Sequence, residues 1–475
     1  MPRDPMLNVL IVLDASPEEP GAPNLFHAWI SDLLVELRAF CRVSLFYPVM
    51  SATGPFYRLC REETADTVRF FTHVPYKHAL FSESFSNTAM EALFTAVLKE
   101  SVFSTVHLLS LRNHSLGYPA IAYAAGLPVV LTVADGWLRH PLYHRCGRSP
   151  DDDASSIRLS NFVASPLSFL AKSVEGRLGR QRYRWWFEEV GRYSSFYNNV
   201  PASGVAPSSL EDREAAVRDM LPYIHSFHFF SSSLYRTCYE RLLPSDRLFF
   251  MAQGIPASRV INNRPFEIER GLSCGFIGDL IPEEGLDELI KAFNALRERG
   301  LPSSLHLYGE LHDNNQYIRH LTALSRNPGV CFHGAIDHHR LGAILDTIDL
   351  LILPTRWPRS DTWLAAQAMA RRKAVIAPAG TAIGDLIKHN RRGVVLKAVT
   401  PEDIENTVAD LEIDRKKAYY LMRVAESGQF VSTQSNAQAL RALYAAALRR
   451  PARTDETELS RRLGRKRSVR SRRGA

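Results

Sequence analysis

The sequence predicts an α/β protein with two domains, each built around a parallel sheet. Short runs rich in Val, Ile and Leu alternate with helical patterns over residues 274–387, and the same alternation opens the chain at residues 8–47. Strands that alternate with amphipathic helices are typical of parallel, doubly wound sheets. A polar stretch at residues 260–272 separates the two halves, and 475 residues are enough for two domains of ordinary size.

The second half of the chain shows the alternation most clearly. Helical spacing of i, i+3, i+4 and i+7 occurs at residues 286–296 and again at 341–348. The continuous apolar runs around these helices predict strands that are buried on both faces. These strands are expected at residues 274–278, 305–309, 330–334, 350–354 and 375–378, with a last strand at 394–396. Ligands of such sheets bind at the carboxyl ends of the strands, so we expect a site near Gly278 and Pro354.

The first half opens with a strand, a helix and a second strand. Residues 8–14 form an apolar run, Asn24 is a candidate N-cap for a helix that reaches Leu37, and residues 42–47 predict the next strand. Further strands are expected at residues 70–74, 106–109, 129–133, 227–230 and 248–251, and further helices at residues 88–99, 119–125, 211–224, 235–243, 401–411, 416–425 and 436–448.

The composition is that of a globular protein without a membrane span. Hydrophobic residues make up 45% of the chain and charged residues 23%. No apolar run approaches the roughly 20 residues that are needed to cross a bilayer. The chain leads directly into a strand, so we expect no signal peptide. The six cysteines form no CxxC pair, which favours buried, reduced thiols and indicates no metal site.

The net charge of +8 is concentrated at the end of the chain. Residues 449–475 contain eleven Arg or Lys and three acids, so this segment alone accounts for the whole excess. It lacks apolar residues that could form a core, and we expect a disordered tail. Such a tail is attracted to anionic lipid by about 1 kcal/mol per basic residue near the surface. A tail that only aids solubility is an equal alternative, and nucleic acid is an unlikely partner because no binding motif accompanies the charge.

One stretch of the second half carries a recognisable residue pattern. Residues 274–387 begin with CGFIGDLIPEEGLDELIKAF and end with LLILPTRWPRSDTWLAAQAMARRKAVIAPAGTAIGDLI. This stretch resembles the nucleotide-sugar-binding domain of glycosyltransferase family 4, the group 1 glycosyltransferases with the GT-B fold. The resemblance implies two Rossmann-like domains that face each other across a cleft. It predicts an acceptor-side domain at residues 1–258, a nucleotide-sugar-binding domain at 259–432, a helix at 433–448 that returns to the first domain, and the tail at 449–475.

The sequence departs from this family at four positions of the donor site. In the family, two basic residues hold the donor diphosphate, one glutamate contacts the sugar hydroxyls, and a second glutamate contacts the ribose. Asp279 and Glu284 stand here in place of the basic pair, and Arg359 and Gln367 stand in place of the two glutamates. The frame around these positions is intact, and the resemblance places the donor against Gly278, Ser360, Asp361 and Thr362.

These substitutions change the electrostatics that a donor diphosphate would meet. Asp279 and Glu284 would repel it, by up to about 4 kcal/mol for a pair of unit charges at about 4 Å near a surface. Gln367 can still bond a ribose hydroxyl, and Arg359 can contact a phosphate through two hydrogen bonds. Arg356 or Arg139 could add positive charge, as could the backbone donors of the frame. In the competing expectation, Arg359 forms a salt bridge with Asp279 or Glu284, and the site is closed to an ordinary donor.

A candidate residue for the acceptor side is Asp135. It follows the predicted strand 129–133, and the resembling family carries Thr, His and Asp in the corresponding segment. Thr132 and Asp135 match that pattern, whereas Ala134 replaces the histidine. Asp135 at the end of a strand is a candidate catalytic base or acceptor contact. The alternative, which is at least as well supported, is an Asx-turn or helix-capping residue.

Two functions are compatible with this pattern. The first is a retaining glycosyltransferase that moves a sugar from a nucleotide-sugar donor to a glycan or lipid-linked acceptor in cell-surface polysaccharide synthesis. It needs no metal or other cofactor, and it would work in the cytoplasm, peripherally at the inner face of the membrane. The second is a catalytically degenerate glycosyltransferase-like protein that binds a partner or a glycan. Family resemblance favours the first function, and the four substitutions favour the second.

Overall fold

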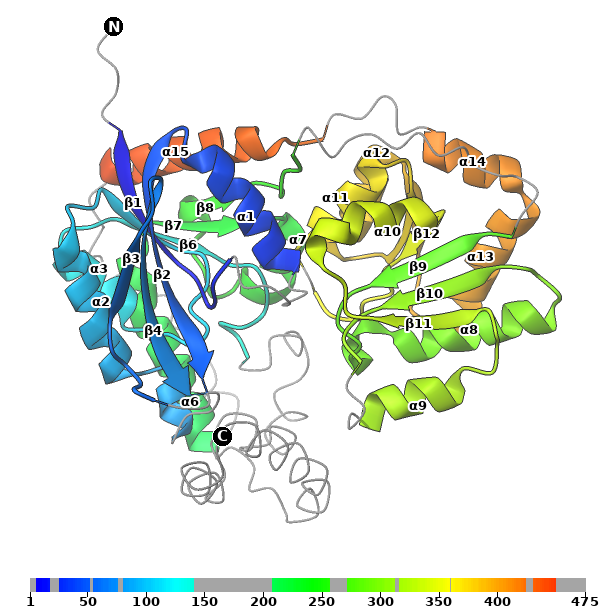
Figure 1. The fold of residues 1–475 in the computed structure, drawn as a ribbon, viewed down its shortest axis with the longest axis horizontal. Helices are drawn as coiled ribbons and strands as arrows, with labels where there is room; N and C mark the ends of the chain where they lie inside the picture. The colour runs from blue at the N-terminus through cyan, green and yellow to red at the C-terminus, as the bar shows by residue number, and fades with distance from the viewer. Residues whose placement is uncertain are drawn as a thin grey trace, which may run out of the picture.

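The computed structural model describes residues 6–17, 25–51, 54–75, 80–140, 207–256, 271–311, 316–358, 360–423 and 430–449. Within these residues the chain forms two α/β domains that lie side by side, each with helices packed around a central sheet (Figure 1). The predicted fold class is therefore confirmed. The division near residue 258 falls outside the described residues and stays a prediction.

The first sheet has eight strands in the order β3-β4-β2-β1-β5-β6-β7-β8. All neighbours in this sheet are parallel except β3 and β4, which are antiparallel. The strands are β1 (Leu7–Val12), β2 (Cys41–Ser51), β3 (Cys60–Glu63), β4 (Thr67–Pro75), β5 (Thr105–Leu108), β6 (Val129–Thr132), β7 (Ser226–Phe229) and β8 (Leu248–Phe250). All but β3 correspond to predicted strands.

Helices cover both faces of this sheet. They are α1 (Leu25–Leu37), α2 (Thr88–Glu100), α3 (Tyr118–Ala124), α6 (Pro207–Met220) and the short α7 (Ser232–Leu234). The predicted helix at residues 235–243 is replaced by one π-helical turn, Tyr235–Tyr239. The prediction that the cysteines are reduced thiols is wrong for Cys238, which is disulfide-bonded. Cys41, Cys60, Cys274 and Cys331 are free.

The second sheet has six parallel strands in the order β11-β10-β9-β12-β13-β14. The strands are β9 (Ser273–Ile277), β10 (Ser304–Tyr308), β11 (Val330–Gly334), β12 (Leu350–Ile352), β13 (Ala374–Pro378) and β14 (Gly393–Leu396). The helices are α8 (Leu286–Glu298), α9 (Gln316–Leu324), α10 (Leu341–Thr347), α11 (Trp363–Ala370), α12 (Ala382–Asn390), α13 (Pro401–Ile413) and α14 (Arg415–Arg423). The strands fall within two residues of the predicted positions.

The last helix, α15 (Thr433–Arg449), lies against the first domain (Figure 1). It packs on α1 and reaches β5 and β6. At its start, the Asn436 side chain accepts a hydrogen bond from the Gly254 amide at 2.5 Å and donates one to the Ala252 carbonyl at 3.0 Å. A Cβ at Gly254 would come within 2.5 Å of the Ser432 backbone, so only glycine permits this approach. In the part of the chain that the structure describes, no helix is both long and apolar enough to span a membrane.

Direct contacts join the two domains where α11 begins. The Gln253 side chain, 3% exposed, accepts hydrogen bonds from the amides of Thr362 at 2.7 Å and Trp363 at 3.1 Å. The Ser360 hydroxyl donates to the Ala134 carbonyl at 2.6 Å. Because α1 also packs on α11 and the buried residues of both form one core, the domain junction is both apolar and hydrogen-bonded.

A buried chain of side-chain hydrogen bonds crosses the first sheet and ends on α15. The Tyr444 hydroxyl is 2.6 Å from Nδ1 of His107, whose Nε2 is 2.8 Å from the Thr132 hydroxyl. That hydroxyl is 2.9 Å from Nδ1 of His228, whose Nε2 is 3.4 Å from the Met251 carbonyl. The carbonyl can only accept, so Nε2 of His228 donates to Met251. With both imidazoles neutral, the other donors follow: Thr132 donates to His228, His107 to Thr132, and Tyr444 to His107.

Burial disfavours the charged form of these imidazoles. It lowers the pKa of His228 to about 4 and, together with the nearby His228, lowers the pKa of His107 well below its usual value. Burial likewise lowers the pKa of His114 to about 4, against opposing effects of the Leu13 carbonyl and Asp14. In the unfolded chain these groups take up protons near pH 6.5.

We therefore expect stability to fall with pH below about 6.5. The folded-state pKa values are depressed, so the stabilisation from neutral histidines is complete above the unfolded pKa and is lost as the pH falls toward 4. Urea unfolding at a series of pH values between 8 and 4.5, with aggregation monitored, measures this directly. A midpoint that stays constant from about pH 7.5 to 5 would contradict the assignment.

The Gln253→Ala variant should be less stable by about 1–2 kcal/mol. The change leaves two buried amides at the start of α11 without an acceptor, which is comparable to the loss of a helix N-cap. Thermal or urea unfolding measures the effect, and the exposed Gln316 gives a matched control, because Gln316→Ala should stay within about 0.5 kcal/mol of the parent. Equal effects of the two substitutions would show that the Gln253 contact does not stabilise the domain junction.

Candidate functional site

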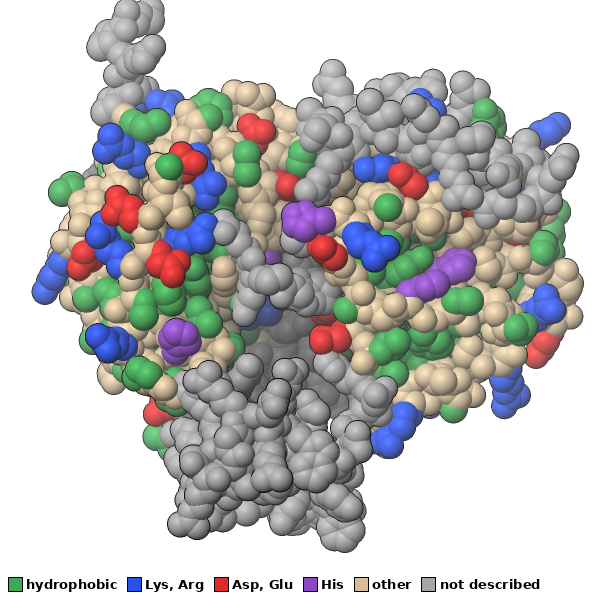
Figure 2. Space-filling model, viewed as in Figure 1, with side chains coloured by type: hydrophobic (Ala, Val, Ile, Leu, Met, Phe, Trp, Pro, Cys, Tyr) green, Lys and Arg blue, Asp and Glu red, His purple; other side chains and the backbone are tan. Residues whose placement is uncertain are grey.

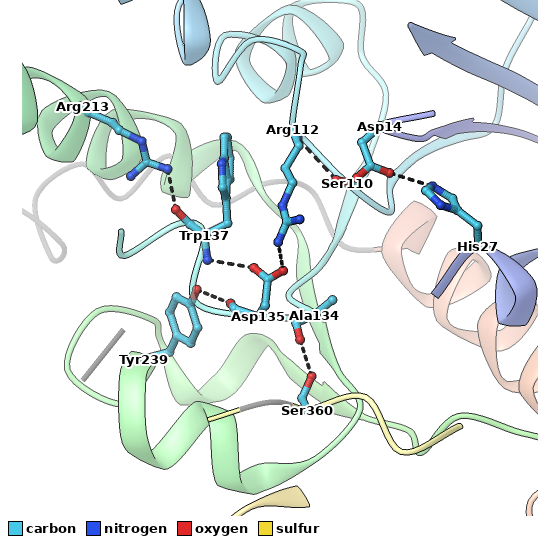
Figure 3. Close-up of polar contacts among 10 residues, drawn as sticks. All are labelled: Asp14, His27, Ser110, Arg112, Ala134, Asp135, Trp137, Arg213, Tyr239 and Ser360. Atoms are coloured by element: carbon cyan, nitrogen blue, oxygen red, sulfur yellow. Dashed lines mark hydrogen bonds and ion pairs between the residues drawn. The ribbon is translucent and has the colours of Figure 1, made fainter. Parts of the chain in front are cut away.

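The candidate site lies where the carboxyl ends of both sheets meet. Figure 2 shows a hollow between the two domains on this face of the molecule. On the first-domain side, the ends of β1, β5 and β6 place Asp14, Arg112 and Asp135 within one close-up that also contains Ser360 of the second domain (Figure 3). Asp135 and Ser360 are among the residues predicted from the sequence, whereas Asp14 and Arg112 are not.

Asp135 has both carboxylate oxygens occupied. Oδ2 forms an ion pair with Arg112, and Oδ1 accepts a hydrogen bond from the Trp137 amide at 2.8 Å (Figure 3). The Tyr239 hydroxyl donates to the Asp135 backbone carbonyl at 2.6 Å. A side chain that bonds the amide two residues further on forms an Asx-turn. The geometry thus supports the turn-forming role that the sequence left open, and the role of Asp135 as a base stays a prediction.

The turn after β6 is held rigidly by a buried cation. Arg213 on α6 lies 4.7 Å from the centre of the Trp137 ring and donates hydrogen bonds to the carbonyls of Trp137 and Leu138. Burial lowers the pKa of this guanidinium to about 10, so it remains charged at neutral pH. Arg213 therefore fixes the turn that carries Asp135.

Glu284, at the position of the family's second basic residue, points into the protein. The residue is 1% exposed, and the Trp357 indole Nε1 donates to its Oε1 at 3.1 Å. It ends a short 3-10 turn (Pro282–Glu284), and the next residue, Gly285, has φ +73. A Cβ there would lie 2.3 Å from the Pro354 carbonyl. The turn before α8 is thus packed directly on the segment that follows β12.

Of the two remaining substituted positions, Asp279 belongs to the described residues and Arg359 does not. Asp279 is exposed and follows Gly278 directly after β9. Arg359 lies outside the described residues, so its expected salt bridge with Asp279 or Glu284 stays a prediction. Arg356, which we considered as a phosphate ligand, instead forms an ion pair with Glu288 on α8. Its backbone amide donates to the Glu283 carbonyl at 2.8 Å, which closes the segment after β12 onto α8.

Two buried polar atoms on the second-domain side of this edge have no hydrogen-bond partner among the described residues. They are Nε2 of Gln367 and Oγ1 of Thr355, and each residue is 1% exposed. Thr355 follows β12, and Gln367 lies in the second turn of α11. An unpaired buried amide or hydroxyl costs about 1–3 kcal/mol, so such atoms mark places where a hydroxyl-bearing ligand could bond. In the described part of the chain, no group of three or more His, Cys, Asp or Glu could hold a metal ion.

The frame residues before α11 contact the first domain. The amides of Thr362 and Trp363 already donate to Gln253, and the Ser360 hydroxyl donates to Ala134. The Thr362 amide is one of the backbone donors that were predicted to hold a donor diphosphate, and in the structure it is bonded to Gln253. Gln253 was not predicted, because its only sequence signal is its place in the Gln-Gly-Ile-Pro turn after β8.

Comparison with known proteins gives a family match for the second domain. Residues 264–427 match the model of group 1 glycosyl transferases. A GDP-mannose-dependent alpha-(1-6)-phosphatidylinositol monomannoside mannosyltransferase from Mycobacterium tuberculosis is 25% identical over 173 residues. That alignment covers 34% of this chain and 44% of the relative. It therefore spans less than half the length of that protein.

Solved structures resemble the chain over nearly its whole length. Sucrose-phosphate synthase from Thermosynechococcus elongatus has a TM-score of 0.57 at 13% identity, covering 96% of this chain and 99% of its own. Anabaena HepE, solved with UDP and glucose, has a TM-score of 0.60 at 12% identity, covering 93% and 100%. WaaG, a glycosyltransferase of lipopolysaccharide biosynthesis, has a TM-score of 0.52 at 12% identity, covering 93% and 98%. The chain therefore has the GT-B fold, and its second domain matches the group 1 glycosyl transferases.

Proposed function

We propose that the protein is a glycosyltransferase that takes a sugar from a nucleotide-sugar donor. The observation that carries this proposal is the match of residues 264–427 to group 1 glycosyl transferases within a GT-B fold. The donor would bind at the carboxyl ends of the second sheet, against Gly278 and the segment before α11, and the acceptor would bind at the carboxyl ends of the first sheet. HepE, solved with UDP, supports a nucleotide-sugar as the donor class.

The finer features of the reaction are part of the same proposal. Retention of the anomeric configuration follows from the resemblance to glycosyltransferase family 4. A glycan or lipid-linked acceptor in cell-surface polysaccharide synthesis is supported by two relatives, one named for a phosphatidylinositol mannoside and one for lipopolysaccharide biosynthesis. Such acceptors place the protein in the cytoplasm, peripherally at the inner face of the membrane.

The donor site would work with a changed set of ligands. Gln367 and Thr355 present buried, unpaired polar atoms that suit ribose or sugar hydroxyls. Arg359 would contact the diphosphate, since a guanidinium matches phosphate oxygens in pairs. Arg139 is exposed after the turn at Asp135 and can supply a further charge from the first domain. Glu284 would take no part, because its carboxylate is buried against Trp357.

A second candidate function is a degenerate transferase that binds a partner or glycan without catalysis. The inward orientation of Glu284 favours it, since no cation replaces the family's basic residue at this position. The bonds from Thr362 and Trp363 to Gln253 favour it as well, because these amides are not available to a phosphate. Binding of the donor separates the two functions.

Calorimetry against a panel of UDP- and GDP-sugars tests the proposal. An active transferase should bind at least one donor at micromolar levels, and the fourfold change Asp279→Arg, Glu284→Lys, Arg359→Glu and Gln367→Glu should weaken that binding by removing Arg359. A degenerate site should bind no donor until the fourfold change restores the family's charges. A matched control with two reversed charges far from the second sheet is Glu62→Lys with Asp66→Arg, both exposed near β3.

Membrane contact through the basic tail is a separate prediction. Deletion of residues 450–475, which follow α15, should leave the melting temperature unchanged within about 2 °C, because the segment has few apolar residues to bury. It should reduce binding to phosphatidylserine-containing vesicles at low salt, with little binding to neutral vesicles in either form. A melting temperature that falls by about 8 °C or more would show that the segment is part of the fold.

A further inference from the structure

Two histidines face each other at the surface of the second sheet. His306 lies on β10 and His333 on β11, the strand at the edge of the sheet. Nδ1 of His306 is 2.9 Å from Nε2 of His333, the ring centroids are 5.2 Å apart, and the angle between the ring planes is 30°. His333 is exposed and His306 half-buried, so solvent reaches the pair. Neither residue is among the proposed donor or acceptor contacts.

A bulge in β11 brings His333 to this position. Leu307 pairs with Phe332, whereas the next residue, Tyr308, pairs with Gly334. His333 is therefore the extra residue of the bulge and has no partner in the strand register. Gly334 has φ +78, a conformation that favours glycine. Bulges redirect a side chain and are frequent beside functional sites, so the local backbone is built to turn the His333 ring toward β10.

Each ring has a second contact that orients it. The His333 ring stacks on the Tyr308 ring, with centroids 4.5 Å apart and an interplanar angle of 14°. Nε2 of His306 is 3.3 Å from the hydroxyl of Ser304, two residues earlier on β10. Histidines that bind a metal ion commonly place their other ring nitrogen against an oxygen, which fixes the ring and its tautomer. Ser304 is in the position to do this for His306.

The distance between the two facing nitrogens fits a metal ion in cis geometry. Imidazole nitrogens bind such ions at about 2.0–2.1 Å, so two nitrogens that subtend 90° at the ion are about 2.9 Å apart. A tetrahedral ion would separate them by about 3.3 Å. The observed 2.9 Å corresponds to the first arrangement. A small rotation of both surface rings turns their lone pairs toward one point.

We propose that His306 and His333 form a binding site for a divalent transition-metal ion with square-planar or octahedral preference, such as Ni²⁺. In the neutral pair one N–H lies between the facing nitrogens. When the ion binds, this proton moves to the other nitrogen of its ring, so Nε2 of His306 carries a hydrogen and can donate it to Ser304. Both rings stay neutral, and both facing lone pairs bind the ion.

The site would have two protein ligands, with water at the remaining positions. Within the described ranges, no third His, Cys, Asp or Glu completes the group. A closed structural zinc site uses four protein ligands, so the pair is unlike one. The bound ion would connect the edge strand to β10 across the bulge. The inference does not depend on the proposed glycosyltransferase function.

The competing explanation is that the pair is only a hydrogen bond between two neutral imidazoles. Titration of the full chain, without an added histidine tag, distinguishes the two explanations. Calorimetry at pH 7.5 in a non-chelating buffer should show one Ni²⁺ bound at micromolar affinity. Zn²⁺ should bind more weakly, because it prefers the wider tetrahedral spacing. Ni²⁺ should also raise the melting temperature of the parent in proportion to the logarithm of its concentration.

Substitution of each ring tests the assignment of the ligands. His306→Gln and His333→Gln should each weaken Ni²⁺ binding by at least about tenfold, because a single imidazole remains. Ser304→Ala should weaken it by a smaller factor, since it removes only the orienting contact. His339→Gln, at an exposed histidine six residues after His333, is the matched control and should bind as the parent does. Without metal, all four variants should melt within about 2 °C of the parent.

Three results would overturn the proposal. The first is a parent chain that binds no Ni²⁺ at micromolar levels. The second is Ni²⁺ binding that survives the double substitution His306→Gln with His333→Gln, since the ion would then lie elsewhere. The third is tighter binding of Zn²⁺ than of Ni²⁺, which contradicts the cis geometry. None of these results affects the donor-binding test of the proposed function.

Discussion

The hydrogen bonds of Gln253 to the first turn of α11 determine how the two halves of the site meet. Gln253 follows the last strand of the first sheet, whereas Thr362 and Trp363 begin a helix of the second domain. A helix start leaves backbone amides without partners, and here one side-chain oxygen from the other domain satisfies two of them. The positions of Ser360 and Gln367 relative to the first sheet follow from this contact.

The same contact limits how an anion could bind. The start of a helix is an effective anion site because free amides and the helix dipole act together. At α11 two amides are engaged by Gln253, and at α8 the first turn is surrounded by Glu283, Asp287 and Glu288. Neither helix start can therefore compensate for the two basic residues that the family uses to hold the diphosphate and that this chain lacks. A bound diphosphate would therefore need positively charged side chains as ligands, and Arg359 is a candidate that the sequence provides.

The centre of the second sheet could be predicted closely because β12 and β13 are buried on both faces and are continuously apolar. β3 could not, because Cys60–Glu63 reads CREE, and its pairing with β4 at the edge of the sheet gives no apolar signal. The frame around Glu284 was recognisable, but its inward orientation depends on Trp357, 73 positions away in sequence. The bonds of Gln253 and the series of hydrogen bonds from Tyr444 to His228 could not be predicted either. Hydrogen bonds between residues far apart in sequence leave no local sequence pattern.

The two carboxylates at the edge of the first sheet differ in what they can do. Asp135 gives one oxygen to Arg112 and the other to the Trp137 amide, so its lone pairs are largely occupied and it holds the turn in place. Asp14 uses one oxygen to orient His27, and burial among few donors makes its negative charge effective at short range. Arg112 lies between them and compensates both charges. The carboxylate of Asp135 would therefore have to lose these bonds before it could accept a proton, which is consistent with its role in holding the turn.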